Sequence, residues 1–168
     1  MGKITRALAL SAFTLTAVFT ATAARAQAED WQHVATACTP STLNALRWAQ
    51  FNTGAGYIRA NNPDAGTLHY TCNVLDSYAT IVPVWNWLTL QYRDTVGGRV
   101  QATLYSKNKV TGATAVVANA IGPAAAGVNN VSVALPGLNF AANGYYVVLS
   151  IASAANNPPQ VHMVQLEQ

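Results

Sequence analysis

Charged residues are scarce in this sequence. Only nine Lys or Arg and six Asp or Glu occur among its 168 residues. Three of the nine basic residues, Lys3, Arg6 and Arg25, lie within the first 26 positions, so residues 27–168 hold six charges of each sign and are formally neutral. A nucleic-acid-binding surface needs clustered basic side chains. The composition therefore argues against nucleic acid as a partner of the mature chain.

The sequence has no apolar run long enough to span a membrane as a helix. The longest run extends from residue 7 to about residue 19, whereas a bilayer helix needs about 20 residues. Basic residues precede this run and an A-x-A sequence follows it at residues 24–26, as in a secretory signal peptide. We predict that residues 1–26 are a signal peptide, with cleavage after Ala28 as the alternative. The mature chain is then secreted or periplasmic and not inserted in a membrane.

Cysteine occurs only twice, at Cys38 and Cys72. An even number of cysteines in an exported chain favours a disulfide, because oxidising compartments form and preserve this bond. The alternatives are a reactive thiol or, with His69 three residues before Cys72, half of a metal site. Two cysteines and three scattered histidines match no common zinc-ligand spacing. We therefore predict no metal and no cofactor.

Side chains suited to acid–base catalysis are also few. Beyond the acidic pair near the mature N-terminus, the carboxylates are Asp64, Asp76, Asp94 and Glu167. They do not cluster as calcium ligands would, and no G-x-S-x-G motif marks a nucleophilic serine. Asp94 enters a Gly-Gly turn, where its side chain is expected to accept hydrogen bonds from turn amides. A hydrolase that uses His69 or His162 is the enzymatic alternative.

Alternation of apolar and polar residues recurs from Trp31 to the C-terminus, and helical periodicity is not sustained. The clearest alternating segments are residues 88–93, 100–105, 131–135 and 145–152. Each has one apolar face, which is typical of antiparallel sheets. We predict that residues 27–168 form a single all-β domain, an antiparallel β-sandwich of jelly-roll or immunoglobulin-like kind with about nine strands.

Turn-forming residues separate the predicted strands. Gly97-Gly98 stands at hairpin distance between two of them, Thr111-Gly112 follows the second, and residues 156–159 precede the last strand. Residues 122–130 are predicted to be a long loop. The segment after Pro40 is compatible with a helical turn capped by Ser41 or Thr42.

Two tryptophans stand two residues apart in the stretch VPVWNWLTLQYRD. If the strand is regular from Val84, its parity places Trp85 and Trp87 together on the polar face, opposite Leu88. Flat apolar rings with a polar edge suit stacking on a sugar ring or a partner surface, and Tyr105 of the next strand would extend the same surface. A bulge after Trp87 would instead bury both rings in the core.

Several short motifs follow one another along most of the mature chain. They are Cys38-Thr39-Pro40, Arg47, residues 56–61 (GYIRAN), residues 70–74 (YTCNV), residues 88–94 (LTLQYRD) and Thr111-Gly112. In this order they resemble a widespread family of exported bacterial proteins of unknown function. The resemblance implies a β-sandwich with Cys38 paired to Cys72. Asn73-Val74 departs from the Pro-Leu that these proteins have after the second cysteine.

These observations favour a non-enzymatic binding or structural module of the periplasm or cell exterior. The leading hypothesis is recognition of a carbohydrate or a cell-surface protein through Trp85, Trp87 and Tyr105. A secreted hydrolase and a self-assembling surface subunit are the alternatives.

Overall fold

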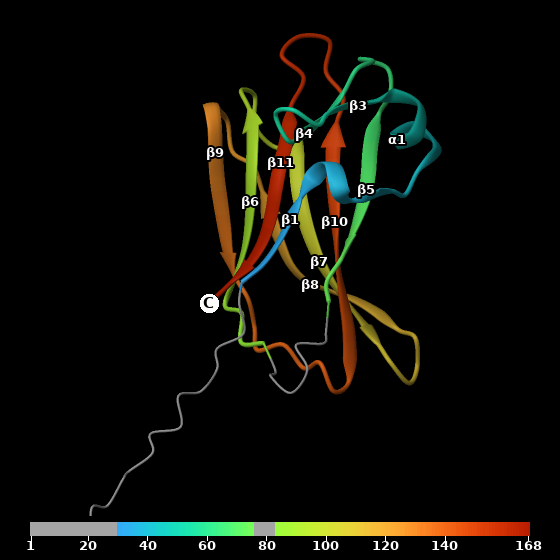
Figure 1. Cartoon of the computed structure of the whole chain (residues 1–168), viewed down its shortest axis with the longest axis vertical. Coiled ribbons are helices and arrows are strands. Elements are labelled where there is room, and N and C mark those ends of the chain that lie inside the picture. The colour runs from blue at the N-terminus through green and yellow to red at the C-terminus, as the bar shows by residue number, and fades with distance from the viewer. Residues whose placement is uncertain (1–29, 76–82) are drawn as a thin grey trace, which may run out of the picture.

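A computed structural model of the chain describes residues 30–75 and 83–168 (Figure 1). The predicted signal peptide and Asp76 lie outside these residues. Eleven strands are described: β1 (Trp31–Val34), β2 (Thr39–Pro40), β3 (Ala49–Asn52), β4 (Tyr57–Ala60), β5 (Thr67–Asn73), β6 (Trp87–Asp94), β7 (Val100–Asn108), β8 (Thr114–Ile121), β9 (Ala125–Ala134), β10 (Asn143–Ala152) and β11 (Gln160–Glu167). The helical elements are η1 (Ala35–Ala37) and α1 (Leu43–Trp48). No helix in the described part of the chain is long and apolar enough to cross a membrane.

The strands form two antiparallel sheets. Sheet A has the order β3-β4-β11-β6-β9, with β1 also paired to β11, and sheet B has the order β2-β5-β10-β7-β8. Apart from the β7–β8 hairpin, the strands from β4 to β11 alternate between the sheets as two Greek keys do, which is the strand order of a jelly roll. The predicted antiparallel β-sandwich is confirmed, and the jelly roll replaces the immunoglobulin-like alternative.

Side chains that alternate inward from the two sheets form one hydrophobic core. The buried inward positions of four central strands are Leu88, Leu90 and Tyr92 of β6, Ala102 and Leu104 of β7, Val147, Leu149 and Ile151 of β10, and Val164 and Leu166 of β11. Burying each large aliphatic side chain contributes about 1.5 to 3 kcal/mol. The intervening residues of the same strands face outward on each sheet, so the core also defines the two outer faces.

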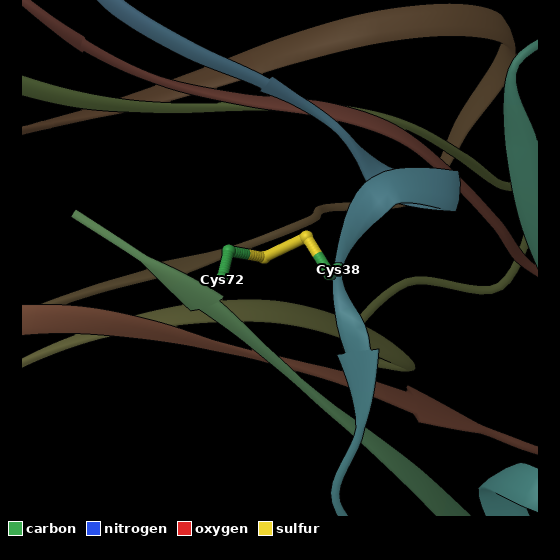
Figure 2. The surroundings of a disulfide bond; sticks show 2 residues. All are labelled: Cys38 and Cys72. Carbon is green, nitrogen blue, oxygen red and sulfur yellow. A yellow bond between two sulfur atoms is a disulfide. The ribbon is translucent and has the colours of Figure 1, made fainter. Parts of the chain in front are cut away.

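The predicted disulfide is present between Cys38 and Cys72 (Figure 2). It joins the segment after η1 to β5, near an end of sheet B, and both residues are buried. The residues that the bond connects are 34 positions apart in the sequence. The reactive-thiol and metal-site alternatives for these cysteines are therefore wrong.

The local structure after the first cysteine follows the predicted cap. Helix α1 begins after Thr42, whose hydroxyl accepts a hydrogen bond from the Ala45 amide at 3.2 Å. Such N-caps satisfy one of the free amides at a helix start. Helix α1 packs beside β5, as Figure 1 shows.

The connection between β6 and β7 is not the hairpin that its glycines suggest. Strand β6 belongs to sheet A and β7 to sheet B, so the chain crosses between the layers here. Gly97 and Gly98 both have positive φ, 88° and 73°, and a Cβ on Gly97 would lie 2.6 Å from the Ala124 amide nitrogen. Position 97 requires glycine for both reasons.

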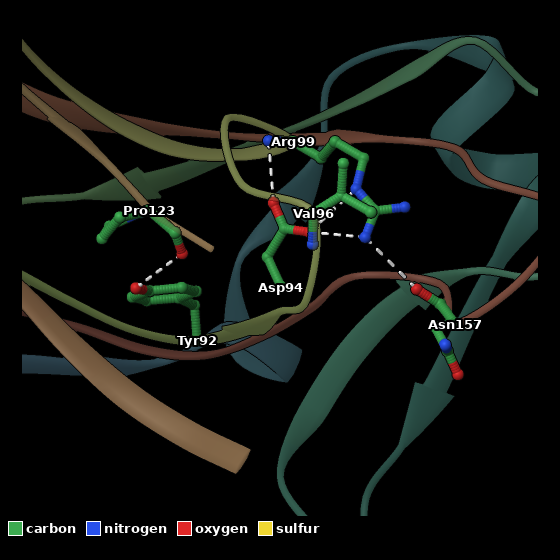
Figure 3. A network of polar contacts seen from close by, with 6 residues as sticks. All are labelled: Tyr92, Asp94, Val96, Arg99, Pro123 and Asn157. Carbon is green, nitrogen blue, oxygen red and sulfur yellow. Dashed lines mark hydrogen bonds and ion pairs between the residues drawn. The ribbon is translucent and has the colours of Figure 1, made fainter. Parts of the chain in front are cut away.

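Asp94 holds this connection together (Figure 3). Its carboxylate accepts hydrogen bonds from the amides of Val96 and Arg99, at 3.2 and 2.9 Å, and from the Arg99 Nε at 2.8 Å. The Arg99 guanidinium also forms an ion pair with Asp94 and donates to the Asn157 carbonyl at 3.5 Å. The predicted turn-bonding role of Asp94 is confirmed.

Candidate functional site

The outer face of sheet A is lined by amides and hydroxyls and holds one exposed tryptophan. Alternation along β6 buries Leu88, Leu90 and Tyr92 and turns the intervening residues outward. Register with the flanking strands then places the outward residues of three strands side by side. We call this surface the amide face; its central residues are Trp87, Thr89, Gln91 and Arg93 of β6, Gln160, Met163, Gln165 and Glu167 of β11, and Asn130, Ser132 and Ala134 of β9.

Trp87 is the aromatic platform of the amide face. It is 43% exposed and stands opposite Glu167 on one neighbouring strand and Ala134 on the other. The small side chain of Ala134 does not screen the ring from that side. The expectation that Trp87 shares a face with Thr89 and Gln91 is confirmed by the register.

Trp85 does not share that face. Its side chain is only 1% exposed, and its ring meets the ring of Phe140 edge-on at a centroid distance of 5.7 Å. The expected pairing of the two tryptophans is wrong because β6 begins at Trp87, and the period-two alternation does not extend back to Trp85. Trp85 is a core residue, and it is not available as a surface ligand-binding residue.

Tyr105 also lies elsewhere. It belongs to β7 in sheet B, so the sandwich separates it from Trp87, and it does not extend the surface as expected. Its ring stacks on the ring of Tyr146 from β10, with centroids 5.3 Å apart and planes at 12°. A hollow of about 370 Å³ adjoins Tyr146 and is also lined by Lys107. The two half-exposed tyrosines form a second aromatic surface, on the opposite side of the molecule.

Polar groups next to Trp87 are linked to one another. The Thr89 hydroxyl lies 2.8 Å from the Ser132 hydroxyl and donates to the Glu167 carboxylate at 3.2 Å. These contacts cross three strands of the sheet, so they hold the three side chains in fixed positions relative to one another. Hydroxyl and carboxylate groups fixed in this way can exchange hydrogen bonds with the hydroxyls of a bound ligand.

The two histidines of the hydrolase alternative are far apart in the fold. His69 lies on β5 of sheet B, where its Nδ1 is 3.0 Å from the Ser150 hydroxyl. His162 lies on β11 of sheet A, where its ring packs against Tyr57 at 5.4 Å. Burial, and then the charge of Arg93, lowers the pKa of His162. Among the described residues, no hydrogen bond or ion pair places a carboxylate behind the His69–Ser150 pair to complete a triad.

No group of three His, Cys, Asp or Glu side chains among residues 30–75 and 83–168 is placed to hold a metal ion. The sequence did not point to this face as a whole, because its residues come from strands that are far apart in the chain. Period-two alternation identifies which side of a strand is polar but does not show which strands become neighbours.

Solved structures share this fold. A family 6 carbohydrate-binding module matches with a TM-score of 0.51 and 13% identity over 82% of this chain and 93% of that one. A second such module, from Clostridium stercorarium and solved with cellobiose, has a TM-score of 0.51 and 12% identity over the same shares. The C-terminal family 6 module of a laminarinase from Zobellia galactanivorans has a TM-score of 0.52 and 11% identity over 83% of this chain and 100% of that one.

These similarities establish the fold, a β-sandwich like that of the three family 6 modules. No model of a known protein family matches the chain. No curated protein matches it in sequence.

Proposed function

We propose that this chain is an exported, non-catalytic module that binds a glycan on the amide face, with Trp87 as the stacking residue. The observation that carries the proposal is the single exposed tryptophan of that face, set among amides and hydroxyls on a rigid sheet. The fold shared with carbohydrate-binding modules supports it.

The chemistry of the face suits a sugar. A sugar ring presents C–H groups on its flat side and hydroxyls at its rim, so it needs an apolar surface beside groups that both donate and accept hydrogen bonds. The ring of Trp87 supplies the apolar surface. The amides of Gln91, Gln165 and Asn130 donate and accept at once, and neutral amides lose less hydration free energy on binding than charged groups do.

The test is binding of residues 27–168 to a panel of polysaccharides, followed by tryptophan fluorescence and isothermal titration calorimetry. Trp87→Ala is expected to weaken binding by about fivefold to thirtyfold, because loss of an aromatic stacking surface costs about 1 to 2 kcal/mol. Trp48→Ala is the matched control, since Trp48 is a comparably exposed tryptophan (38%) at the end of α1. It should leave the affinity unchanged.

A second variant separates the two aromatic surfaces. Replacing Tyr105 and Tyr146 together with alanine removes the stacked pair of sheet B and leaves the amide face intact. Binding that survives this change and is lost with Trp87→Ala supports the proposal. Binding that shows the reverse pattern would move the site to sheet B, and the absence of any glycan ligand would reject glycan recognition altogether.

A further inference from the structure

Two arginines flank one glutamine on the amide face. Gln160 of β11 is in register with Arg59 of β4 on one side and with Arg93 of β6 on the other. Neighbouring strands lie about 4.8 Å apart, so the two arginine backbones are separated by about 10 Å across the sheet. Guanidinium groups on side chains of this length can reach the space above Gln160 from both sides.

The space above Gln160 is a small surface hollow. Its volume is about 90 Å³, and its lining residues are Arg59, Arg93, Thr95, Asn157, Pro158 and Gln160. Gln160 is almost fully buried beneath it. The loop residue Asn157 has a positive φ of 49°, and its carbonyl is held by Arg99. The loop between β10 and β11 is thus fixed against the rim of the hollow.

The contacts of Arg59 orient its guanidinium. Its Nε donates to the Gln50 amide oxygen at 2.6 Å, and its guanidinium carbon lies 6.0 Å from the centre of the Tyr57 ring. Both contacts involve neutral groups. They hold the planar group in place while its positive charge remains without a carboxylate partner.

Neither Arg59 nor Arg93 has an acidic partner in the described part of the chain. The ion pair found among these residues joins Arg99 to Asp94. Asp94 follows Arg93 directly, but its carboxylate is buried and engaged by Arg99 and the turn amides. Glu167 lies at the Trp87 end of the face. Two guanidiniums that line one small hollow repel each other, and an anion between them would relieve that repulsion.

We propose that the hollow between Arg59 and Arg93 binds an oxyanion carried by the glycan, a uronic acid carboxylate or a sulfate ester. Two N–H groups of a guanidinium match two oxygens of such an anion, and the Gln160 amide at the base adds a further polar contact. This inference rests on the proposed function, because it names the class of glycan that the amide face selects.

The position of the hollow fits a single extended ligand. Trp87 and Arg93 lie on the same side of β6 and are six residues apart, which is about 20 Å along the strand. In the interval, Gln91 lies beside Met163 of β11, and the buried Thr89 holds the side chains of Ser132 and Glu167. An oligosaccharide that stacks on Trp87 and follows β6 would therefore present its acidic group to the arginines.

The experiment compares three glycans by calorimetry: polygalacturonate for a carboxylate, dextran sulfate for a sulfate ester, and dextran as the neutral reference. Arg59→Gln/Arg93→Gln is the test variant. Arg47→Gln/Lys107→Gln is the matched control, because it also removes two positive charges, from exposed positions on α1 and on β7 of sheet B. Circular dichroism confirms that each variant is folded.

The test variant is expected to lose about tenfold or more in affinity for the acidic glycan that binds, with the control close to wild type. The polysaccharide that responds identifies the anion as carboxylate or sulfate. If the test and control variants lose affinity equally, the loss comes from the change in net charge, and the inference is overturned. Binding of dextran as tight as that of the acidic glycans, lost in Trp87→Ala alone, would overturn the inference and leave the proposed function standing. Binding of none of them, nor of any glycan in the wider panel, would reject both.

Discussion

At the scale of single residues, Asp94 shows how a buried charge is retained in a charge-poor chain. Burial alone would raise the pKa of its carboxyl, but hydrogen bonds from the Arg99 backbone and side chain and from the amides of Val96 and Gly97 outweigh this and lower the pKa. Burial, and then the nearby Asp94 charge, raises the pKa of the Tyr92 hydroxyl, which donates to the Pro123 carbonyl at 3.0 Å. The connection between the sheets thus depends on an ionised Asp94.

We predict that Asp94→Asn lowers the free energy of unfolding by about 2 to 4 kcal/mol, because it leaves the Arg99 charge without its partner. The lowered pKa of Asp94 means that its contribution is complete above the unfolded-state pKa of about 3.9 and is lost as the pH falls through the folded-state value. Urea unfolding at pH 7 and at lower pH measures both effects. Asp64→Asn, in an exposed loop, is the control, and an equal loss in that variant would contradict the prediction.

His162 makes stability depend on pH in a higher range. Its Nε2 is buried and has no hydrogen-bond partner among the described residues, and its pKa is lowered by burial and by Arg93. The unfolded chain therefore binds a proton more readily than the folded one does. Stability is complete above about pH 6.5 and declines as the pH falls toward the folded-state pKa of His162. Burial lowers the pKa of His33 as well, so it contributes with the same sign.

We expect His162→Phe, which keeps an aromatic ring against Tyr57, to reduce the loss of unfolding free energy between about pH 7.5 and about pH 5.5. His33→Phe is the comparison, and it should also reduce the loss of unfolding free energy between the two pH values. The double variant should show the smallest loss. Denaturant unfolding at both pH values gives the result. A wild-type pH dependence in His162→Phe would show that this side chain is not the titrating group.

At the scale of strands and turns, alternation predicted most of the sandwich. The segments at 88–93, 100–105 and 145–152 lie within β6, β7 and β10, because one buried face per strand imposes a period of two. The Thr111-Gly112 turn does join two paired strands, β7 and β8. Gly97-Gly98 does not, because a glycine pair permits a sharp change of direction in the chain without specifying the sheet that receives the next strand.

Edge strands and strand ends were the least predictable elements. Residues 122–130, predicted to be a loop, include the first half of β9, an edge strand whose small side chains bury little surface and so show weak alternation. Trp85 was misplaced because it lies just before the start of β6. The amide face itself follows from pairing register, which depends on contacts between distant segments and which no local pattern in one sequence supplies.

The disulfide between Cys38 and Cys72 stabilises the arrangement of the N-terminal segment against β5. It ties the N-terminal segment to β5 across 34 positions, and closing a loop of that length stabilises the fold by about 3 to 4 kcal/mol on the chain-entropy model. We predict that Cys38→Ala/Cys72→Ala lowers the free energy of unfolding by about this amount. Dithiothreitol should destabilise the wild type similarly and leave the variant unaffected. A variant with the denaturation midpoint of the oxidised wild type would contradict the prediction.

At the scale of the whole molecule, the jelly roll presents two outer faces of different character. The amide face of sheet A combines Trp87 with the two arginines that lack acidic partners, whereas sheet B presents the tyrosine stack and the His69–Ser150 pair. The space between the two sheets is filled by the core, so a ligand on one face makes no contact with the other. Variants of Trp87 and of the tyrosine pair therefore report on independent surfaces.

The scarcity of charge makes salt a sensitive probe of the amide face. Few other charges surround Arg59 and Arg93, so electrostatic attraction of an acidic glycan should arise mainly from this pair. The Debye length falls from about 10 Å at 0.1 M salt to about 3 Å at 1 M. We predict that affinity for an acidic glycan falls severalfold between about 0.05 and about 0.5 M NaCl, while affinity for a neutral glycan that stacks on Trp87 changes little. In Arg59→Gln/Arg93→Gln the salt dependence of the affinity should be largely lost. If calorimetric titrations show that this variant keeps the full wild-type dependence of affinity on NaCl concentration, the charges that bind the anion lie elsewhere.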